Sequence, residues 1–157
     1  MPSKIRRATL EDVDPIEAID KVWYHDAFLY TKNEFRDMVN GTRPTHNLFV
    51  RASPANEVEA YLIYMVMPNA TRDVYIVSLA GKANARAALA GFLVRKFARK
   101  NASRRFYTHG KRAWGMAELE AAGFKRKGKG NMADEVVPFV DDISKLHVWE
   151  HVSAPKN

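Results

Sequence analysis

The chain has 157 residues, of which 46% are hydrophobic and 27% charged, and it contains no cysteine. This length suits one domain with its own hydrophobic core, and the composition is that of a soluble globular protein. The absence of cysteine excludes disulfides, thiolate catalysis and cysteine-ligated zinc. The N-terminal segment is charged and lacks the apolar centre of a signal peptide, and no run approaches the roughly 20 apolar residues of a membrane helix. We therefore expect a single cytoplasmic domain over residues 1–157.

The formal net charge of +7 is concentrated in two basic stretches, Arg95–Arg112 and Lys125–Lys129. Such stretches suit a phosphorylated cofactor, nucleic acid or an acidic partner. A solvated helix face with basic ends is the simpler explanation, and we favour it over nucleic-acid binding.

The first third of the chain predicts a strand followed by two helices. Lys4–Thr9 has the pattern of a strand, and Thr9 opens the sequence T-L-E-D, which is typical of a helix cap. Apolar residues at helical spacing then continue to about Trp23. A second helix is expected to begin at Thr31, in the capping box T-K-N-E, and to end near Gly41.

The remaining pattern predicts strands separated by two more helices. Three strands joined by hairpin-length turns, which form an antiparallel meander, are expected over Asn47–Ala52, Val58–Met67 and Asp73–Leu79. After them we expect a helix over Lys82–Lys100, a strand over Arg105–His109, a helix over Arg112–Ala122, a strand from Phe124 and its partner over Glu135–Val140. The predicted order is β-α-α-β-β-β-α-β-α-β-β, an α/β (α+β) fold with a mixed, mostly antiparallel sheet flanked by helices.

The segment Asp73–Phe97 is the strongest candidate for a ligand site. An apolar strand meets a short turn at Gly81 and Lys82, and an alanine-rich helix follows. Backbone N–H groups at the start of a helix favour anions, and small side chains let the backbone approach a phosphate. An ordinary strand–helix unit, whose alanines merely suit a helix, explains the same pattern.

The element order and three local patterns resemble the GCN5-related N-acetyltransferase (GNAT) superfamily. The opening IRRATLEDVDPI contains Arg-x-Ala-Thr before an acidic helix, Asp73–Phe97 matches the family's pyrophosphate-binding unit, and RAWGMAELEAAGFKR is similar to its closing helix before Gly-Phe. The resemblance covers roughly Lys4 to Val140. It implies the acyl-CoA N-acyltransferase fold, transfer of an acetyl group to a primary amine, and acetyl-CoA as co-substrate.

The resemblance also implies where acetyl-CoA would bind. The pantetheine arm would follow the backbone at Val77, Ser78 and Leu79, and the pyrophosphate would lie at Lys82 and Asn84–Ala88, which spans Asn84, Ala85, Arg86, Ala87 and Ala88. The family's turn reads Arg or Gln, two residues, Gly, one residue, then Gly or Ala. Its positions can be placed at Asn84, Ala87 and Leu89, at Ala85, Ala88 and Ala90, or at Lys82, Ala85 and Ala87. None of these placements contains glycine, and Lys82, Asn84 and Arg86 offer side-chain contacts to phosphate instead.

Two further family positions are replaced in this chain. Counted from Gly123-Phe124, the family's asparagine corresponds to Arg112, and the tyrosine that protonates the leaving thiolate corresponds to Leu119. Leucine cannot donate a proton. Two alternatives therefore stay open: a catalytically silent binding or structural protein of this fold, of the kind that phages encode, and a nucleic-acid-associated member that uses its basic stretches.

Acetyl transfer to an amine needs an oxyanion donor and a base that accepts the amine proton. The backbone N–H near Ser78–Leu79 is the candidate donor. The candidate bases are Glu59, Asp73 and His109, with Tyr75 as a further titratable group. Histidine titrates near neutral pH, which suits a general base, whereas a surface position is the ordinary explanation for a single His or Glu.

The acceptor is expected near Trp23, Tyr24, His25 and Asp26, between the first two helices, where the family builds one wall of its acceptor site. Aromatic rings beside His and Asp suit an amine. The acceptor would be a small-molecule or peptide amine, and no membrane partner is expected. No metal is expected either, because His147 and His151 lack an acidic third ligand. The resemblance allows a monomer or a homodimer formed through Glu135–Val140.

Overall fold

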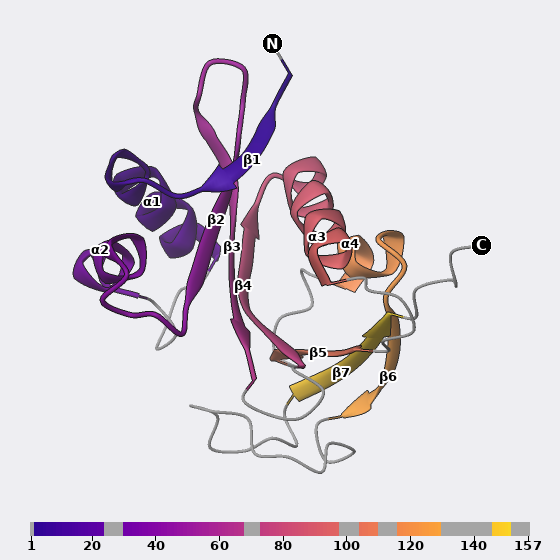
Figure 1. Cartoon of the computed structure of the whole chain (residues 1–157). Helices are drawn as coiled ribbons and strands as arrows, with labels where there is room; N and C mark the ends of the chain where they lie inside the picture. The colour runs from indigo at the N-terminus through magenta and orange to yellow at the C-terminus, as the bar shows by residue number, and fades with distance from the viewer. Residues whose placement is uncertain are drawn as a thin grey trace. The chain divides into compact units, whose positions relative to one another are not determined.

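The computed structural model describes residues 2–23, 30–67, 73–97, 104–109, 116–129 and 146–151. The chain divides into two compact units, one made of Met1–Tyr64 and Ser78–Leu89, the other of Met65–Val77 and Ala90–Asn157. The elements, drawn in Figure 1, are β1 (Lys4–Arg7), the 3₁₀ helix η1 (Leu10–Asp12), α1 (Val13–Trp23), α2 (Lys32–Asn40), β2 (Asn47–Ala52), β3 (Val58–Val66), β4 (Val74–Gly81), α3 (Ala83–Phe97), β5 (Arg104–His109), α4 (Met116–Ala121), β6 (Lys125–Lys129) and β7 (Leu146–His151). Their order confirms the predicted one, with η1 added before α1.

The first unit is a sheet with helices on one face. β1 pairs antiparallel with β2, and β2 pairs antiparallel with β3. The end of β4 lies along β3, where the Lys82 N–H donates to the Glu59 carbonyl oxygen over 3.0 Å. Helices α1 and α2 cover one face of β1–β3 (Figure 1), and the fully buried Phe35 of α2 meets Tyr61 of β3 edge to face, with ring centres 6.1 Å apart. This contact joins helix and sheet through apolar burial.

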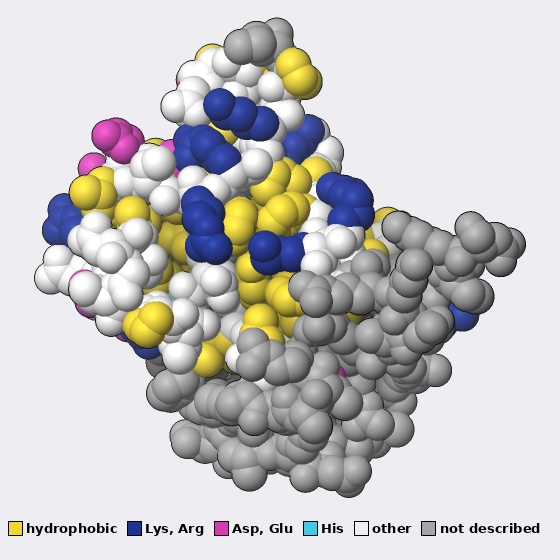
Figure 2. Space-filling model, in the orientation of Figure 1, with side chains coloured by type: hydrophobic (Ala, Val, Ile, Leu, Met, Phe, Trp, Pro, Cys, Tyr) yellow, Lys and Arg dark blue, Asp and Glu magenta, His cyan; other side chains and the backbone are white. Residues whose placement is uncertain are grey.

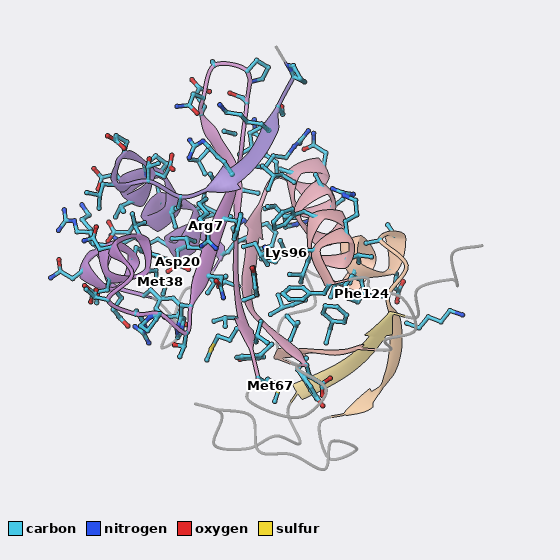
Figure 3. The ribbon with its side chains drawn as sticks, viewed as in Figure 1. Arg7, Asp20, Met38, Met67, Lys96 and Phe124 are labelled. Carbon is cyan, nitrogen blue, oxygen red and sulfur yellow. The ribbon has the colours of Figure 1, made fainter. Side chains whose placement is uncertain are left out.

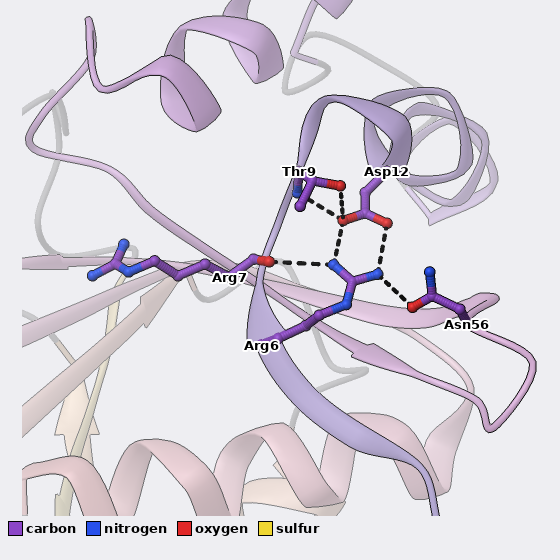
Figure 4. A network of polar contacts seen from close by, with 5 residues as sticks. All are labelled: Arg6, Arg7, Thr9, Asp12 and Asn56. Atoms are coloured by element: carbon purple, nitrogen blue, oxygen red, sulfur yellow. Dashed lines mark hydrogen bonds and ion pairs between the residues drawn. The ribbon is translucent and has the colours of Figure 1, made fainter. Parts of the chain in front are cut away.

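The Asp12 carboxylate stabilises the link from β1 to α1 through hydrogen bonds. Asp12 accepts hydrogen bonds from Arg6 at 2.6 Å and 3.0 Å and from the backbone N–H of Thr9 at 2.7 Å, as Figure 4 shows. Arg6 also donates to the Asn56 side chain in the β2–β3 turn, over 2.9 Å. The predicted cap at Thr9 is confirmed. Burial opposes ionisation of Asp12, but Arg6 and the Thr9 N–H outweigh it and lower the pKa of this carboxyl.

The second helix begins and ends where the sequence predicts. The Thr31 hydroxyl accepts from the Glu34 N–H over 3.1 Å, and the Glu34 carboxylate accepts from the Thr31 N–H over 3.0 Å. These reciprocal bonds form the capping box. Gly41 ends α2 in the left-handed conformation at φ 80°, which glycine adopts without a steric penalty.

A buried carboxylate lies between α1 and the sheet. Asp20 is fully buried, accepts from the hydroxyl of Tyr61 and also accepts from the Tyr30 N–H over 3.2 Å. Figure 3 shows Asp20 and Met38 on the side of the two helices that faces the strands. Asp20 therefore ties α1 both to β3 and to the start of the segment that leads into α2.

The second unit holds the only parallel strand pair among the described residues. Val74–Ile76 of β4 pairs parallel with Phe106–Thr108 of β5, β5 pairs antiparallel with β7, and β7 pairs antiparallel with β6. The strand order in this unit is therefore β4-β5-β7-β6. Phe106 and Phe124, the latter labelled in Figure 3, pack edge to face with ring centres 4.6 Å apart.

The C-terminal pairing differs from the prediction. The strand from Phe124 is confirmed as β6, but its partner is Leu146–His151, which the sequence reading did not assign to a strand. Glu135–Val140, the predicted partner, lies outside the described residues. The segment LHVWEH has three apolar residues, Leu146, Val148 and Trp149, which do not alternate regularly with its polar residues, so its strand signal is weak.

Candidate functional site

The candidate site begins where β4 passes into α3 with a single intervening residue. Gly81 ends β4 at φ +122°, a conformation that side chains disfavour. A Cβ at this position would lie 2.4 Å from the Glu59 carbonyl oxygen and 2.6 Å from the Cα of Ala60. Only glycine therefore fits, and it lets α3 begin directly beside the start of β3.

The first turn of α3 presents backbone donors. The first hydrogen bond within the helix runs from the Arg86 N–H to the Lys82 carbonyl oxygen, over 2.9 Å. The N–H groups of Ala83, Asn84 and Ala85 precede it, and no described residue accepts from them. Such amides, at the positive end of the helix dipole, are suitable donors to a phosphate.

The side chains around these amides are small or exposed. Lys82, Ala83 and Asn84 are exposed, Ala85 is buried, and Ala87 and Ala88 are half-buried. Of the three placements of the family pattern, the one at Lys82, Ala85 and Ala87 lies nearest the amides of the first turn. The other two begin at Asn84 and Ala85 and extend to Leu89 and Ala90, further into the helix, where the N–H groups are used by helical hydrogen bonds.

Arg86 is turned away from solvent. Only 7% of its surface is exposed, and its guanidinium lies 4.3 Å from the centre of the Trp23 ring. Trp23 is the last residue of α1. Two residues predicted for different roles, phosphate binding and acceptor binding, therefore contact each other, and this cation–π contact fixes the end of α1 against the start of α3.

Glu59, a predicted base, belongs to β3 and lies beside the C-terminal end of β4. Its carboxylate is 3.3 Å from the Ser3 hydroxyl, 3.9 Å from Nη1 of Arg51 and 3.9 Å from Nζ of Lys82. Lys82 follows Ser78 by four residues, about 13 Å along an extended strand. The Glu59 side chain is therefore well placed to act on a group near Lys82, and distant from the backbone near Ser78.

The other predicted catalytic residues lie elsewhere. Asp73 precedes β4, is 2% exposed and accepts the Met67 N–H at its carbonyl oxygen over 2.7 Å. Tyr75 is buried within β4. His109 ends β5 opposite Leu146, and its side chain is outside the described residues. Tyr24, His25 and Asp26 also lie outside them.

The segment predicted to bind pantetheine, Val77–Leu79, comes directly after the residues of β4 that pair with β5. The parallel pairing of β4 with β5 covers Val74–Ile76, whereas β4 continues to Gly81. Val77 is half-buried, and Ser78 and Leu79 are buried. An extended ligand adds to a sheet through such backbone, whose contacts depend little on side-chain identity.

The closing helix confirms the predicted stop at Gly123. The Phe124 N–H donates to the Leu119 carbonyl oxygen over 3.0 Å, and Gly123 adopts φ 95°. These features end α4 in a Schellman-type turn. Leu119 itself is 2% exposed and packs in the core. Arg112, at the family's asparagine position, lies outside the described residues.

A buried histidine near α2 was not singled out from the sequence. His46 is 6% exposed, its Nδ1 lies 2.9 Å from the Thr45 hydroxyl, and its ring meets Tyr30 edge to face. Burial, aided by Arg43, lowers the pKa of His46 to about 4. The only signal in the sequence is the position of His46 immediately before an apolar strand.

The described part of the chain carries both basic and acidic side chains on its surface (Figure 2). Figure 2 shows Lys and Arg side chains distributed around exposed hydrophobic side chains, with Asp and Glu side chains over α1. Arg95 and Lys96 are exposed in the last turn of α3, while much of the first basic stretch falls outside the described residues. Within the described ranges, no group of three or more His, Asp or Glu side chains could hold a metal ion. No helix among them is long and apolar enough to cross a membrane.

Comparison with solved structures identifies the fold. The chain is similar to an acetyltransferase from Salmonella typhimurium that modifies the N-terminal serine of a 50S ribosomal subunit protein, with TM-score 0.67, 16% identity and coverage of 98% and 96% of the two chains. It is also similar to a GNAT-superfamily phosphinothricin acetyltransferase from Sinorhizobium meliloti in complex with acetyl-CoA, with TM-score 0.61, 17% identity and coverage of 96% and 87%. A ribosomal-protein-alanine N-acetyltransferase from Brucella melitensis gives TM-score 0.61, 19% identity and coverage of 96% and 99%.

No protein-family model and no curated protein sequence matches the chain. The likeness therefore rests on three-dimensional structure, and it extends over nearly the whole chain in each comparison. The element order, the strand–turn–helix at Gly81 and the closing Gly-Phe turn agree with it. The chain has the mixed-sheet fold of the GCN5-related N-acetyltransferases.

Proposed function

We propose that this protein is an acetyl-CoA-dependent N-acetyltransferase that acts on a primary amine in the cytoplasm. The observation that carries the proposal is the start of α3, where the N–H groups of Ala83, Asn84 and Ala85 precede the first helical hydrogen bond beside the exposed Lys82. The similarity to solved acetyltransferases, one of them in complex with acetyl-CoA, supports it.

The residues at the β4–α3 turn fit the pyrophosphate of acetyl-CoA. The three amides would donate to its oxygens, and Lys82 and Asn84 would add side-chain contacts. Ala85, Ala87 and Ala88 keep this surface shallow, which substitutes in part for the glycines of related turns. Arg86 supports the site indirectly, because its guanidinium packs on Trp23.

The thioester would supply an acetyl group activated for attack by an amine. The backbone at Val77, Ser78 and Leu79 would hold the pantetheine arm, and an N–H near Ser78–Leu79 would stabilise the oxyanion. The amine must lose a proton, for which Glu59, Asp73 and His109 remain the candidates. Histidine side chains in general titrate near neutral pH, which suits a general base.

The acceptor amine would approach the segment between α1 and α2, where Trp23, Tyr24, His25 and Asp26 are the candidate contacts. The related structures include enzymes for protein N-termini and for a small molecule, so both classes of amine belong in the test. Either a monomer or a homodimer suits this proposal.

Two measurements test the activity. Excess acetyl-CoA should raise the melting temperature of the purified chain, because a ligand that binds only the folded state stabilises it. Release of free CoA should then accelerate when peptides with free N-termini, polyamines or small amino acids are added. If acetyl-CoA does not raise the melting temperature and no acceptor accelerates the release of CoA, the proposal is wrong.

A catalytically silent acyl-CoA-binding protein is the second candidate. The buried Leu119, at the position of the usual acid, favours it. In that case acetyl-CoA stabilises the chain, but CoA release stays at the rate without protein for every acceptor. A nucleic-acid-binding role predicts instead an affinity for RNA or DNA that falls steeply with salt.

A further inference from the structure

Glu59 and Lys82 form an ion pair at the start of α3. The Nζ of Lys82 lies 3.9 Å from Oε2 of Glu59. The backbone brings the two residues together, because the Lys82 N–H donates to the Glu59 carbonyl oxygen over 3.0 Å. Both side chains line an open groove of about 430 Å³, so a ligand can reach the pair. Lys82 can therefore exchange this carboxylate for another anion without disturbing the core.

The two oxygens of the Glu59 carboxylate have different neighbours. Oε1 accepts from the Ser3 hydroxyl over 3.3 Å and lies 3.9 Å from Nη1 of Arg51, whereas Oε2 is the oxygen beside Lys82. The Glu59 side chain is 14% exposed and the Lys82 side chain is 70% exposed. The carboxylate is therefore held in place by its surroundings, and the ammonium group is the partner that is free to turn toward a ligand.

We propose that Glu59 is a positioning residue that draws Lys82 away from the pyrophosphate and so limits the affinity for acetyl-CoA. This inference rests on the proposed function, because it concerns the same phosphate site. Lys82 must give up the carboxylate of Glu59 before its ammonium group can contact a phosphate oxygen. Glu59 therefore opposes binding of the anionic part of the ligand and leaves binding of the uncharged thioester arm unaffected.

The position of Glu59 separates this role from that of a general base. A base must reach the amine proton directly or through one water molecule. The thioester is proposed to lie near Ser78, and Lys82 follows Ser78 by four residues, about 13 Å along an extended strand. Glu59 contacts Lys82, so its carboxylate lies near the phosphate end of the proposed ligand and far from the thioester end.

The test is calorimetric titration of the full chain with acetyl-CoA, inorganic pyrophosphate and S-acetylpantetheine, which carries the thioester but no phosphate. Glu59→Gln removes the charge and keeps an oxygen that can accept from Ser3. Glu57→Gln is the matched control, because it removes the same charge from an exposed residue of the β2–β3 turn. Glu59→Asp keeps the charge but withdraws it from Lys82 by one methylene. Melting curves report whether each variant is folded, and Glu59→Asp carries the test if Glu59→Gln does not fold.

We expect Glu59→Gln to bind acetyl-CoA and pyrophosphate about fivefold more tightly than the natural chain, the ratio that one exposed ion pair can contribute. Glu59→Asp should lie between the two, and Glu57→Gln should match the natural chain. S-acetylpantetheine should bind each of these proteins equally. When Lys82→Gln is already present, Glu59→Gln should raise the affinity by less than about twofold, because the side chain that it releases is absent.

Four results would overturn the inference. If Glu59→Gln binds acetyl-CoA as tightly as the natural chain or more weakly, Glu59 does not restrain Lys82, and the proposed function stands. If the gain in affinity is just as large beside Lys82→Gln, Glu59 acts without Lys82. If Glu59→Gln lowers kcat and leaves the affinity for acetyl-CoA unchanged, Glu59 is the base. If the natural chain binds neither acetyl-CoA nor pyrophosphate, both the inference and the proposed function are wrong.

Discussion

The guanidinium of Arg86 lies 4.3 Å from the centre of the Trp23 ring. This contact joins the last residue of α1 to the second turn of α3, immediately after the amides proposed for the pyrophosphate. Arg86 was predicted to bind phosphate and Trp23 to bind the acceptor, and the two side chains contact each other. This pair therefore packs the end of α1 against the start of α3.

Gly81 should tolerate no side chain. Gly81→Ala introduces a Cβ only 2.4 Å from the Glu59 carbonyl oxygen at a positive φ, so either β3 or the start of α3 must move. We expect a loss of roughly 3 kcal/mol in unfolding free energy, measured by chemical denaturation, together with weaker acetyl-CoA binding. Gly41→Ala is the control. Its φ is +80° but nothing lies within 4 Å, so only the conformational cost of about 1 kcal/mol applies. Equal losses at the two positions would contradict the steric explanation.

The Arg6–Asp12 pair should stabilise the fold above the pKa of Asp12. Asp12→Asn removes the carboxylate from Arg6 and from the Thr9 N–H, and we expect a loss of about 2 kcal/mol at pH 7. Because folding lowers the pKa of Asp12, its contribution is present above the ordinary value near 3.8 and is lost as the pH falls below it. Denaturation at pH 7 and pH 3 should therefore show a smaller difference between variant and natural chain at the lower pH.

Asp14→Asn is the matched control for this pair. The Asp14 side chain is 77% exposed and contacts Lys32 across the surface, over 2.9 Å. Solvent screens such a contact, so its removal should change stability much less than Asp12→Asn does. A larger effect at Asp14 would contradict the central role of Asp12 at the β1–η1 link.

His46 should make the fold sensitive to mild acid. Its pKa is about 4 when folded and 6.5 in an ordinary environment, so the unfolded chain binds a proton first as the pH falls. Stability should be constant with respect to this group above pH 6.5 and should fall between pH 6.5 and about 4, by on the order of 3 kcal/mol. His46→Phe keeps an aromatic ring against Tyr30 and removes the titration. Urea midpoints at pH 7 and pH 5 that shift equally in both proteins would count against this assignment.

Leu119→Tyr should test whether a lost proton donor limits turnover. If the chain is an acetyltransferase, a hydroxyl at this position would supply the acid that the family resemblance assigns there, and kcat should rise several-fold. Leu119→Phe is the size control, because Leu119 is 2% exposed and any larger ring disturbs its packing. A rise that is equal in both variants, or absent from both, would mean that a phenol hydroxyl at this position does not assist turnover.

The sequence predicted most of the fold because its local signals agree with the tertiary structure. The cap at Thr9, the box at Thr31 and the stop at Gly123 each form through bonds within a few residues. β7 was missed because LHVWEH is stabilised by pairing with β5 and β6, which are distant in sequence. Long-range pairing leaves little trace in local composition.

The site was predictable in its backbone and less so in its side chains. The glycine turn and the small residues after it were visible in the sequence, and their place at the end of β4 is confirmed. The Arg86–Trp23 contact and the Glu59–Lys82 pair could not be read from spacing, because each joins elements brought together by folding. Tyr24, His25 and Asp26, outside the described residues, stay predictions.

Calorimetric titration of acetyl-CoA into the natural chain and into Lys82→Glu is the most direct test of the central claim, that the start of α3 binds the pyrophosphate. Lys82 is exposed, so the substitution should leave the fold intact, which a melting curve will verify. We predict saturable binding to the natural chain and at least a tenfold loss of affinity in the variant. Equal affinity in the two proteins, or no binding to the natural chain, would contradict the claim.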